Sequence, residues 1–390
     1  MVDVLHLCFG GFGGHMAVTN ALAKDLDTLG VTSGVIAVSP AESILVSREF
    51  WPAMSLIEPV VVTGRGDVAS MARVFAIGRR TKARAVLVHT HRHAAPLAIG
   101  RLSSGQPVNM VSVEHHSLEL RTNTDNANSI SALLWSKASV FLTEEYLRAY
   151  PLRAAKLPGL ATRAVIANGI DLKPYISLHR NSPRGIGGPT LGMAARLVPS
   201  KDVETILEAI TIAIKSQDSK VPHLRIAGDG PERSRLEARV AELNIRQCVS
   251  FLGHVPESQM PSFLDSLDIY VLSTHGETFN TSLIQAAAAR VPIVATRAPG
   301  IASVFTDGVD AILFEPADPS SLEAAIKKAS DPSVASAIVA AAFELVSSKF
   351  NSWVMTEAYL SLLALIDPSG PWLAAKLRMG GEADPHVRHN

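Results

Sequence analysis

The chain has 390 residues, of which 47% are hydrophobic and 18% are charged. This length predicts two domains, and the apolar content excludes intrinsic disorder as the main state. Lysine and arginine together number 36, as do aspartate and glutamate, so the formal net charge is zero and a dedicated nucleic-acid binder is not expected. Two cysteines are too few for a disulfide framework or a cysteine-based zinc site.

The first residues and the hydropathy of the chain bear on its location. Residues 1–5 lack a basic region and carry Asp3, so they predict the first strand of a domain rather than a signal peptide. No run of about 18 consecutive apolar residues predicts a membrane-spanning helix. The sequence therefore predicts a cytoplasmic protein.

The first half of the chain alternates short apolar runs with helical stretches. Helical spacing of apolar residues predicts helices over 15–29, 68–80 and 130–137. The predicted strands are Asp3–Phe9, Val35–Val38, Val60–Val62, Ala85–Val88, Met110–Val113 and Ser139–Leu142. Short strands separated by helices indicate βαβ units and a parallel sheet.

The second half repeats this alternation more regularly. The predicted strands are Thr190–Ala195, Leu224–Ala227, Val249–Leu252, Ile269–Ser273, Pro292–Thr296 and Ala311–Phe314. The predicted helices are Val203–Lys215, Glu232–Leu243, Ser258–Leu267, Thr281–Arg290 and Ser320–Ala329. The pattern indicates a second α/β domain with a parallel sheet.

A stretch rich in glycine and proline, residues 173–188, predicts a linker between the halves. We therefore expect a Rossmann-like domain over 1–172 and another over 189–350, facing each other across a cleft. An amphipathic helix over 352–366 is expected to pack back on the first domain. Residues 367–390, rich in proline, glycine and charge, predict a loose tail.

A cluster of glycines at 10–14 lies between the first predicted strand and helix. The cluster either forms a tight turn or lets the backbone approach an anion at the helix N-terminus. A nicotinamide site is not supported, because Met16 stands where a dinucleotide fingerprint needs glycine or alanine. The second strand also ends near Ser39 without the acidic residue that would bind a ribose.

Two cations follow the first strand of the second half. Arg196 and Lys201 lie on either side of Pro199, in a turn. They either converge on a diphosphate or remain solvated surface charges.

The segment 276–285 follows the predicted strand that ends at Ser273. Glu277 lies in the loop, where a carboxylate either holds sugar hydroxyl groups or complements the helix dipole. Asn280 or Thr281 is suited to cap the next helix, whose N-terminus suits a phosphate. The amide of Gln285, about one turn further on, suits a ribose.

Taken in order, these motifs resemble those of the family-4 retaining glycosyltransferases (glycosyltransferase group 1). The matching segments of the second half are Ala195–Lys201, Ile226–Pro231, Phe251–Val255, the Glu277 loop, Val291–Thr296, Asp307–Ala311 and Phe350–Trp353. In the first half they are the glycine cluster, Glu114 with His115, and Ala167–Asp171. The resemblance implies the GT-B fold, an α/β fold with two Rossmann-like, doubly wound domains that face each other across a cleft.

The resemblance implies four catalytic residues. Arg196 and Lys201 would neutralise the donor diphosphate, Glu277 would hold hydroxyl groups of the donor sugar, and His115 would face the reacting centre. It also implies donor-binding roles for Gly13, Gly14, Gly253, His254, Val255, Phe279, Asn280, Thr281, Ser282 and Gln285, with Gly253, His254 and Val255 framing the base. It implies no cofactor and no metal, because cations and helix N–H groups take the place of a divalent ion.

Two positions depart from the family pattern. The family has a second glutamate eight residues after the first, where this chain has Gln285. A neutral amide still bonds ribose hydroxyl groups, with altered strength. The family's next loop has two glycines followed by an acid, whereas this chain has Pro299-Gly-Ile-Ala-Ser303.

The implied reaction moves a sugar from a nucleoside-diphosphate sugar to a hydroxyl group, with retained anomeric configuration. The expected donor is UDP-hexose or UDP-N-acetylhexosamine, and the acceptor is a glycan, glycolipid or small metabolite. An alternative is a GT-B protein that binds a nucleotide sugar with weak or no turnover, which Gln285 and Ser303 motivate. An epimerase or phosphorylase is a third interpretation, but the sequence shows neither poised acids nor a pyridoxal lysine motif.

Two further clusters have alternative interpretations. His89, His91 and His93 either bind a metal or line the cleft. The basic run 79–84 either contacts anionic lipid, as a peripheral protein at the inner face of the membrane would, or complements a helix C-terminus.

Overall fold

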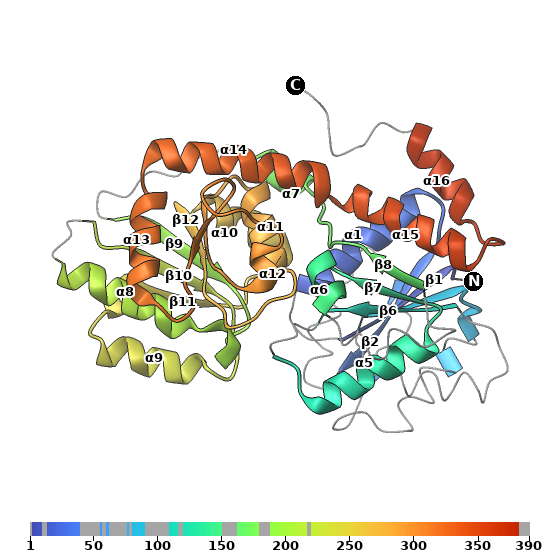
Figure 1. Ribbon diagram of the computed structural model, residues 1–390, viewed down its shortest axis with the longest axis horizontal. Helices are drawn as coiled ribbons and strands as arrows, with labels where there is room; N and C mark the ends of the chain where they lie inside the picture. Colours follow the sequence, from blue (N-terminus) through green and yellow to red (C-terminus); the bar gives the residue numbers. More distant parts are fainter. Residues whose placement is uncertain are drawn as a thin grey trace. The chain divides into compact units, whose positions relative to one another are not determined.

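The computed structural model describes residues 2–9, 14–39, 55–56, 60–61, 76–77, 80–89, 109–115, 120–149, 162–178, 188–216 and 220–381. The chain divides into two compact units (Figure 1). Unit 1 comprises Met1–Gly169 and Asn351–Asn390, and unit 2 comprises Ile170–Phe350. Each unit has its own parallel sheet with helices packed on it, as the sequence predicts.

The sheet of unit 1 has the strand order β3-β2-β1-β5-β6-β7-β8, and β4 also pairs with β2. All of these pairings are parallel. The strands are β1 (Val4–Phe9), β2 (Ser33–Ser39), β3 (Ser55–Leu56), β4 (Val60–Val61), β5 (Ala85–Val88), β6 (Asn109–Glu114), β7 (Ala138–Phe141) and β8 (Thr162–Val165). β6 and β7 are buried along their whole length, as expected for a parallel sheet covered on both faces.

Among the described residues of unit 1, three helices come from its first segment and two from the end of the chain. They are α1 (Gly14–Thr28), α5 (Asn123–Trp135), α6 (Glu144–Ala149), α15 (Ser352–Ile366) and α16 (Trp372–Gly381). α15 packs on α1 (Figure 1), where Thr356 donates a hydrogen bond to buried Asp25 over 3.3 Å. The last helices of the chain therefore complete the first unit.

α5 begins seven residues before the predicted helix at 130. Its first turns are polar, so apolar spacing does not reveal them. Thr122 and Asp125 form a capping box, in which each side chain accepts a hydrogen bond from the other residue's backbone N–H. This local exchange fixes the start of the helix.

The loose tail predicted from residue 367 is wrong as far as residue 381, because α16 is folded there. Trp372 is completely buried, and its indole N–H donates to Asp367 over 3.3 Å. Asp367 also pairs with Arg84, which directly precedes β5, over 3.1 Å. Composition over 367–390 hides α16, whose buried side chains Trp372, Ala375 and Met379 recur at helical spacing. Residues 382–390 lie outside the described residues.

The sheet of unit 2 has the strand order β11-β10-β9-β12-β13-β14, and its strands pair in parallel. The strands are β9 (Thr190–Ala194), β10 (His223–Ala227), β11 (Val249–Gly253), β12 (Ile269–Leu272), β13 (Ile293–Thr296) and β14 (Ile312–Phe314). Each coincides with a predicted strand to within about two residues.

The helices of unit 2 pack on both faces of its sheet (Figure 1). They are α7 (Lys173–Ile176), α8 (Val203–Lys215), α9 (Arg233–Glu242), α10 (Met260–Asp265), α11 (Thr281–Ala288), α12 (Pro299–Ala302), α13 (Pro319–Ala329) and α14 (Pro332–Lys349). The linker predicted over 173–188 is wrong at its start, because α7 is folded and Tyr175 is buried. Residues 179–187 lie outside the described residues.

Close backbone approach holds the loop after β9. The backbone N–H groups of Ala195 and Leu197 donate to the carbonyls of Ala227 and Asp229 over 3.1 and 2.9 Å. Gly228 permits this contact, because a Cβ there would lie 1.9 Å from the Ala195 carbonyl oxygen, and its φ is +153°. The segment that carries Arg196 is therefore fixed by the strand beside it.

In the described part of the chain, no single helix has both the length and the apolar character of a membrane span. One pair of helices, α13 and α14, meets the two criteria jointly but is bent by 92°.

We expect Trp372→Ala to lower the free energy of unfolding of unit 1 by about 3–5 kcal/mol, the usual cost of truncating a buried aromatic side chain. Urea unfolding followed by circular dichroism measures this loss. The neighbouring Leu373 is 61% exposed, so Leu373→Ala should stay within about 0.5 kcal/mol of wild type. Equal stability of the two variants would show that α16 does not dock.

We expect Gly228→Ala to destabilise unit 2 by about 2–4 kcal/mol, because the added Cβ meets a carbonyl oxygen and strains a left-handed backbone. Gly308→Ala is the matched control, since Gly308 also has positive φ (+74°) but has no heavy atom within 4 Å of a built Cβ. Gly308→Ala should destabilise unit 2 by only about 1 kcal/mol, because it strains the backbone without a steric clash. Urea midpoints of the two variants, measured side by side, give the contribution of the close approach.

Candidate functional site

Lys201 and Glu277 form an ion pair at the carboxyl edge of the unit 2 sheet. Lys201 ends the 3-10 turn η4 (Pro199–Lys201) after β9, and Glu277 lies in the loop after β12. The two side chains are only 18% and 16% exposed. The two residues are 76 positions apart in the sequence. They come into direct contact because the strands that precede them, β9 and β12, are neighbours in the sheet.

Backbone contacts hold these two loops together independently of the charges. The carbonyl of Ser200 accepts from the N–H of His275 over 2.8 Å and from the hydroxyl of Thr274 over 2.9 Å. On the other side, a Cβ at Gly300 would lie 1.9 Å from the carbonyl oxygen of Glu277. The backbone of Glu277 is therefore enclosed by η4 and by the start of α12.

A chain of hydrogen bonds orients the carboxylate of Glu277. The hydroxyl of buried Tyr270 donates to Ser282 over 2.6 Å, and Ser282 donates to the amide oxygen of Asn280 over 2.6 Å. Asn280 caps α11 by accepting from the N–H of Leu283, and its amide nitrogen donates to Glu277 over 2.8 Å. Burial raises the pKa of Tyr270 to about 12, so the phenol keeps the proton that it donates.

Arg196 is the contrasting cation of this edge. It is exposed, and no carboxylate in the described part of the chain pairs with it. Its loop is nevertheless fixed by β10. The site therefore combines one cation that is already neutralised, Lys201, with one that is available to an anion.

The remaining predicted residues of unit 2 follow β11 or lie in α11. Gly253 ends β11 with φ +70°, His254 is exposed and Val255 is half-buried. Thr281 begins α11 and is buried. Phe279 is also buried, with its ring edge-on to Phe350 at 5.3 Å, so its backbone rather than its side chain is suited to a ligand.

Gln285 is buried and joins a cluster separate from the Glu277 group. Its amide nitrogen donates to the carboxylate of Glu257 over 2.7 Å. Glu257 begins the 3-10 turn η6 (Glu257–Gln259), and the hydroxyl of Tyr175 lies 3.4 Å from the same oxygen. The carboxyl packs against these two buried side chains, which raises the pKa of Glu257 by desolvation.

The predicted residues of unit 1 are His115, Gly14 and Gly13. Gly14 begins α1, and Gly13 lies outside the described residues. His115 follows β6 and ends a row of three histidines. Its Nε2 lies 3.3 Å from Nδ1 of His89, whose Nε2 lies 3.2 Å from Nδ1 of His6.

The strand register explains this row. His6 is opposite Leu87 of β5, and Leu87 is opposite Val111 of β6. Measured along the register, His89 is two positions, and His115 four positions, closer to the carboxyl edge than His6. Even steps keep side chains on one face of a sheet, so the row rises from the core to the edge. Burial lowers the pKa of His6 to about 3 and that of His89 well below its usual value, and both rings are neutral at pH 7.

Glu114, the neighbour of His115, is completely buried and forms an ion pair with Arg121. Arg121 also donates to the hydroxyl of Tyr146 over 2.5 Å, and Ser129 donates to Glu114 over 3.3 Å. These contacts hold the end of β6 against α5 and α6. In the strand-end motif, Glu114 therefore stabilises the fold, and His115 lies at the carboxyl edge of the sheet.

Among the described residues, no group of three or more histidine, cysteine, aspartate and glutamate side chains is arranged around a metal position. His91 and His93, which the sequence couples to His89 as metal candidates, lie outside those residues, as does Arg79 of the basic run. His89 itself bonds other histidine rings in a row.

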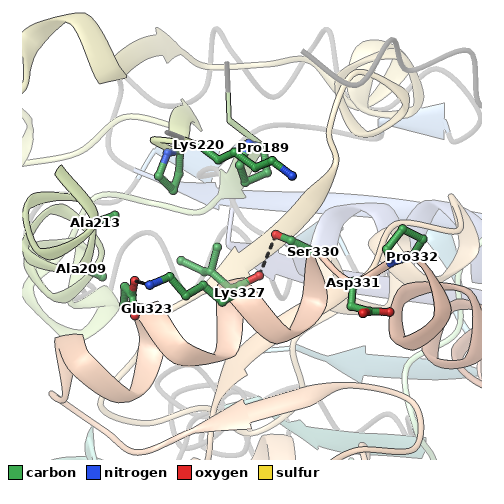
Figure 2. Close-up of a pocket in the computed structure, with 11 residues that line it drawn as sticks. Pro189, Ala209, Ala213, Lys220, Glu323, Lys327, Ser330, Asp331 and Pro332 are labelled. Carbon is green, nitrogen blue, oxygen red and sulfur yellow. Dashed lines mark hydrogen bonds and ion pairs between the residues drawn. The ribbon is translucent and has the colours of Figure 1, made fainter. Parts of the chain in front are cut away.

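A cavity of about 370 Å³ in unit 2 lies away from the predicted site residues (Figure 2). It opens between α8 and α13 at the amino ends of β9 and β10, where Glu323 and Lys327 form an ion pair over 2.6 Å. Its lining residues are Pro189, Ala209, Ala213, Lys220, Pro222, Glu323, Ile326, Lys327, Ser330, Asp331 and Pro332. None of them is a predicted donor-site residue.

Several residues of the two carboxylate clusters and of the histidine row match no sequence motif. Tyr270 lies within a buried strand, and His6 lies within the first strand, so both resemble core positions. Tyr175 lies in the predicted linker. The sequence does point to Glu257, because this residue follows Val255, a predicted base-binding residue, by two positions.

Below pH 6.5 we expect the stability of unit 1 to fall, because unfolded histidine takes up a proton that folded His6 and His89 do not. The folded pKa of His6 is depressed, so its contribution is complete above the unfolded value of 6.5 and is lost as pH falls toward 3. His6→Asn keeps a polar group near Nδ1 and removes the titration. It should reduce the slope of unfolding free energy against pH by up to about 1.4 kcal/mol per unit between pH 6 and 4.

Cys8→Ala is the control for this measurement, because Cys8 is buried on the same strand and burial raises the pKa of its thiol to about 12. Cys8→Ala should lower stability at every pH and leave the slope unchanged. Urea unfolding from pH 7.5 to 4 compares the three proteins. An unchanged slope in His6→Asn would mean that His6 does not titrate on unfolding.

The chain is similar to a known protein family and to known proteins. Residues 178–341 match the family model described as glycosyl transferases group 1. The 2-deoxystreptamine N-acetyl-D-glucosaminyltransferase of Niallia circulans is 33% identical over 138 residues, which are 35% of this chain and 36% of that protein. Glycogen synthase of Mycobacterium tuberculosis is 24% identical over 366 residues, which are 92% of this chain and 84% of that protein.

Solved structures share the whole fold. Anabaena HepE, whose crystal structure is a complex with UDP and glucose, has a TM-score of 0.78 at 19% identity, covering 94% of this chain and 100% of its own. Sucrose-phosphate synthase from Thermosynechococcus elongatus has a TM-score of 0.74 at 16% identity, with coverage of 94% and 100%. The fold is GT-B, and the resemblance seen in the sequence is confirmed. Residues 178–341 of this chain are therefore similar to the glycosyltransferase group 1 family, and the two-domain fold around them is shared with glycosyltransferases of known structure.

Proposed function

We propose that the chain is a retaining glycosyltransferase that moves a sugar from a nucleoside-diphosphate sugar, UDP-hexose or UDP-N-acetylhexosamine, to a hydroxyl group of a glycan, glycolipid or small metabolite. The observation that carries the proposal is the carboxyl edge of unit 2. There, the Lys201–Glu277 pair, the N-terminus of α11 and Arg196 follow neighbouring strands, and Arg196 pairs with no carboxylate in the described ranges. This is the edge at which open parallel sheets bind ligands.

The charges of this edge suit a diphosphate. Arg196 offers a guanidinium without a carboxylate partner among the described residues, and Lys201 is held in place by Glu277. The first amides of α11 precede Leu283, whose N–H is already used by Asn280. Helix N-termini present such amides to anions. HepE binds UDP and, in another structure, UDP-glucose, which supports a uracil nucleotide as donor.

In the proposed reaction the bond between the anomeric carbon and the β-phosphate oxygen breaks, and the acceptor oxygen bonds to the same face of that carbon. The acceptor's proton passes to the leaving phosphate oxygen, so the step is balanced without a protein nucleophile. Negative charge grows on the diphosphate as the bond breaks. Arg196 and Lys201 are positioned to stabilise that charge more strongly in the transition state than in the ground state.

On this proposal Glu277 holds hydroxyl groups of the donor sugar. One of its oxygens is taken by Lys201 and Asn280, and the other has no partner in the described part of the chain. Two cations and helix amides supply the positive charge, so we expect turnover to survive EDTA. The proposed location is the cytoplasm. A contact of the basic run 79–84 with anionic lipid stays a sequence hypothesis.

The second candidate is a protein that binds the nucleotide sugar with little turnover, which Gln285 in place of an acid favours. Slow hydrolysis of the bound donor in the absence of acceptor distinguishes the two. Released sugar supports the enzyme, and stable bound donor supports the binding protein.

We expect Arg196→Ala to weaken UDP binding at least tenfold and to lower donor turnover about 10²-fold, the scale of losing one charge-stabilising group. Isothermal titration with UDP, without metal, measures the binding. Arg246→Ala is the matched control, because Arg246 is also exposed and unpaired among the described residues but precedes β11, at the opposite edge of the sheet. Equal loss in both variants, or none in either, would contradict the proposed diphosphate site.

A further inference from the structure

We propose that Glu257 supplies the carboxylate that binds the ribose of the nucleoside diphosphate, and that Gln285 and Tyr175 orient it. This inference rests on the proposed donor site. It names a residue, outside the sequence motifs, that binds the ribose of the donor. Position 285, where the sequence resemblance expects an acid, carries an amide. The structure places a carboxylate against that amide from another loop.

Glu257 is suited to receive a ligand because its charge is not neutralised. No lysine or arginine in the described part of the chain pairs with it, in contrast to Glu277. Its Oε1 faces two neutral donors, the amide of Gln285 at 2.7 Å and the hydroxyl of Tyr175 at 3.4 Å. Its Oε2 has no hydrogen-bond partner among those residues, and the residue as a whole is exposed.

The two neutral donors fix the carboxylate from behind. Gln285 and Tyr175 are buried, with exposures of 4% and 3%, and both side chains donate to Oε1 of Glu257. Burial and the adjacent carboxylate raise the pKa of Tyr175, which therefore remains a donor. Their bonds to Oε1 leave Oε2 of this exposed residue as an acceptor, which is what a ribose hydroxyl group needs.

The position of Glu257 along the proposed ligand agrees with this role. Gln285 lies about one helical turn from Thr281, where the N-terminus of α11 would bind phosphate. His254 and Val255, which the resemblance assigns to the base, directly precede Pro256 and Glu257. A ribose joins phosphate to base in every nucleotide, and Glu257 lies between the residues proposed for the two.

The test compares UDP with 2′-deoxy-UDP and 3′-deoxy-UDP by isothermal titration, with GDP, ADP and their deoxy forms in parallel. For wild type we expect the loss of a hydroxyl group to weaken binding about tenfold, because it removes a hydrogen bond to a carboxylate. In Glu257→Gln the acceptor is neutral, and the preference for the ribonucleotide should fall to about two- to threefold. A residue that only supports the fold would weaken UDP and its deoxy forms equally and leave their ratio unchanged.

The exchange variant Glu257→Gln/Gln285→Glu is the matched rescue. It returns the carboxylate to position 285 and keeps an amide as its donor, so the preference for UDP over 2′-deoxy-UDP should return to within about threefold of wild type. Gln285→Glu alone places two carboxylates together and should weaken UDP binding at pH 8 more than at pH 6, where a shared proton relieves the repulsion.

The outcomes separate this inference from the proposed function. Wild type that binds no nucleoside diphosphate overturns both. Wild type that binds UDP, with the same ribose preference in Glu257→Gln, overturns only the role of Glu257. A lowered preference in Glu257→Gln together with its recovery in the exchange variant supports the proposal.

Discussion

An ion pair at the carboxyl edge of unit 2 is the constraint on which the candidate site depends. Lys201 and Glu277 are mostly withdrawn from water, and removing one partner of such a pair leaves an uncompensated charge. The loops that carry them are also joined through Ser200 and enclosed by Gly300. A diphosphate would therefore meet a lysine whose side chain is already ordered, which reduces the entropy lost on binding. Arg196, which pairs with no carboxylate among the residues that the structure describes, then adds attraction without a competing contact.

Amide side chains orient both carboxylates of this edge, with opposite electrostatic results. Asn280 donates to Glu277, which Lys201 neutralises, and Gln285 donates to Glu257, which no described cation neutralises. The positive end of the site thus follows β9 and β12, and its negative end follows β11. A nucleoside diphosphate has the complementary order, with charged phosphates at one end and hydroxyl donors next to them. The polarity of the edge, rather than any single residue, is what favours this class of ligand.

The fold was predictable where burial leaves a clear pattern in the sequence. β12 and β13 are buried at every position, and such strands stand out as apolar runs. β8 escaped because it is half-buried throughout and includes Arg163. α14 escaped because its buried side chains, Ile338, Ala342 and Val346, form a narrow stripe in a helix that is apolar elsewhere too. In both cases the signal that periodicity needs, a contrast between two faces, is weak.

The site was predictable only where its parts are local in sequence. A strand end followed by a cation or a carboxylate is visible as a motif, and Arg196, Lys201 and Glu277 are candidates of this kind. Contacts between loops depend on register and side-chain rotamers, which the sequence does not display. His6, His89 and His115 form a row only because β1, β5 and β6 pair so that each histidine lies two positions beyond the last. Once that register is known, the row follows from strand geometry alone, and the same reasoning places Glu257 beside Gln285 only after β11 and α11 are in position.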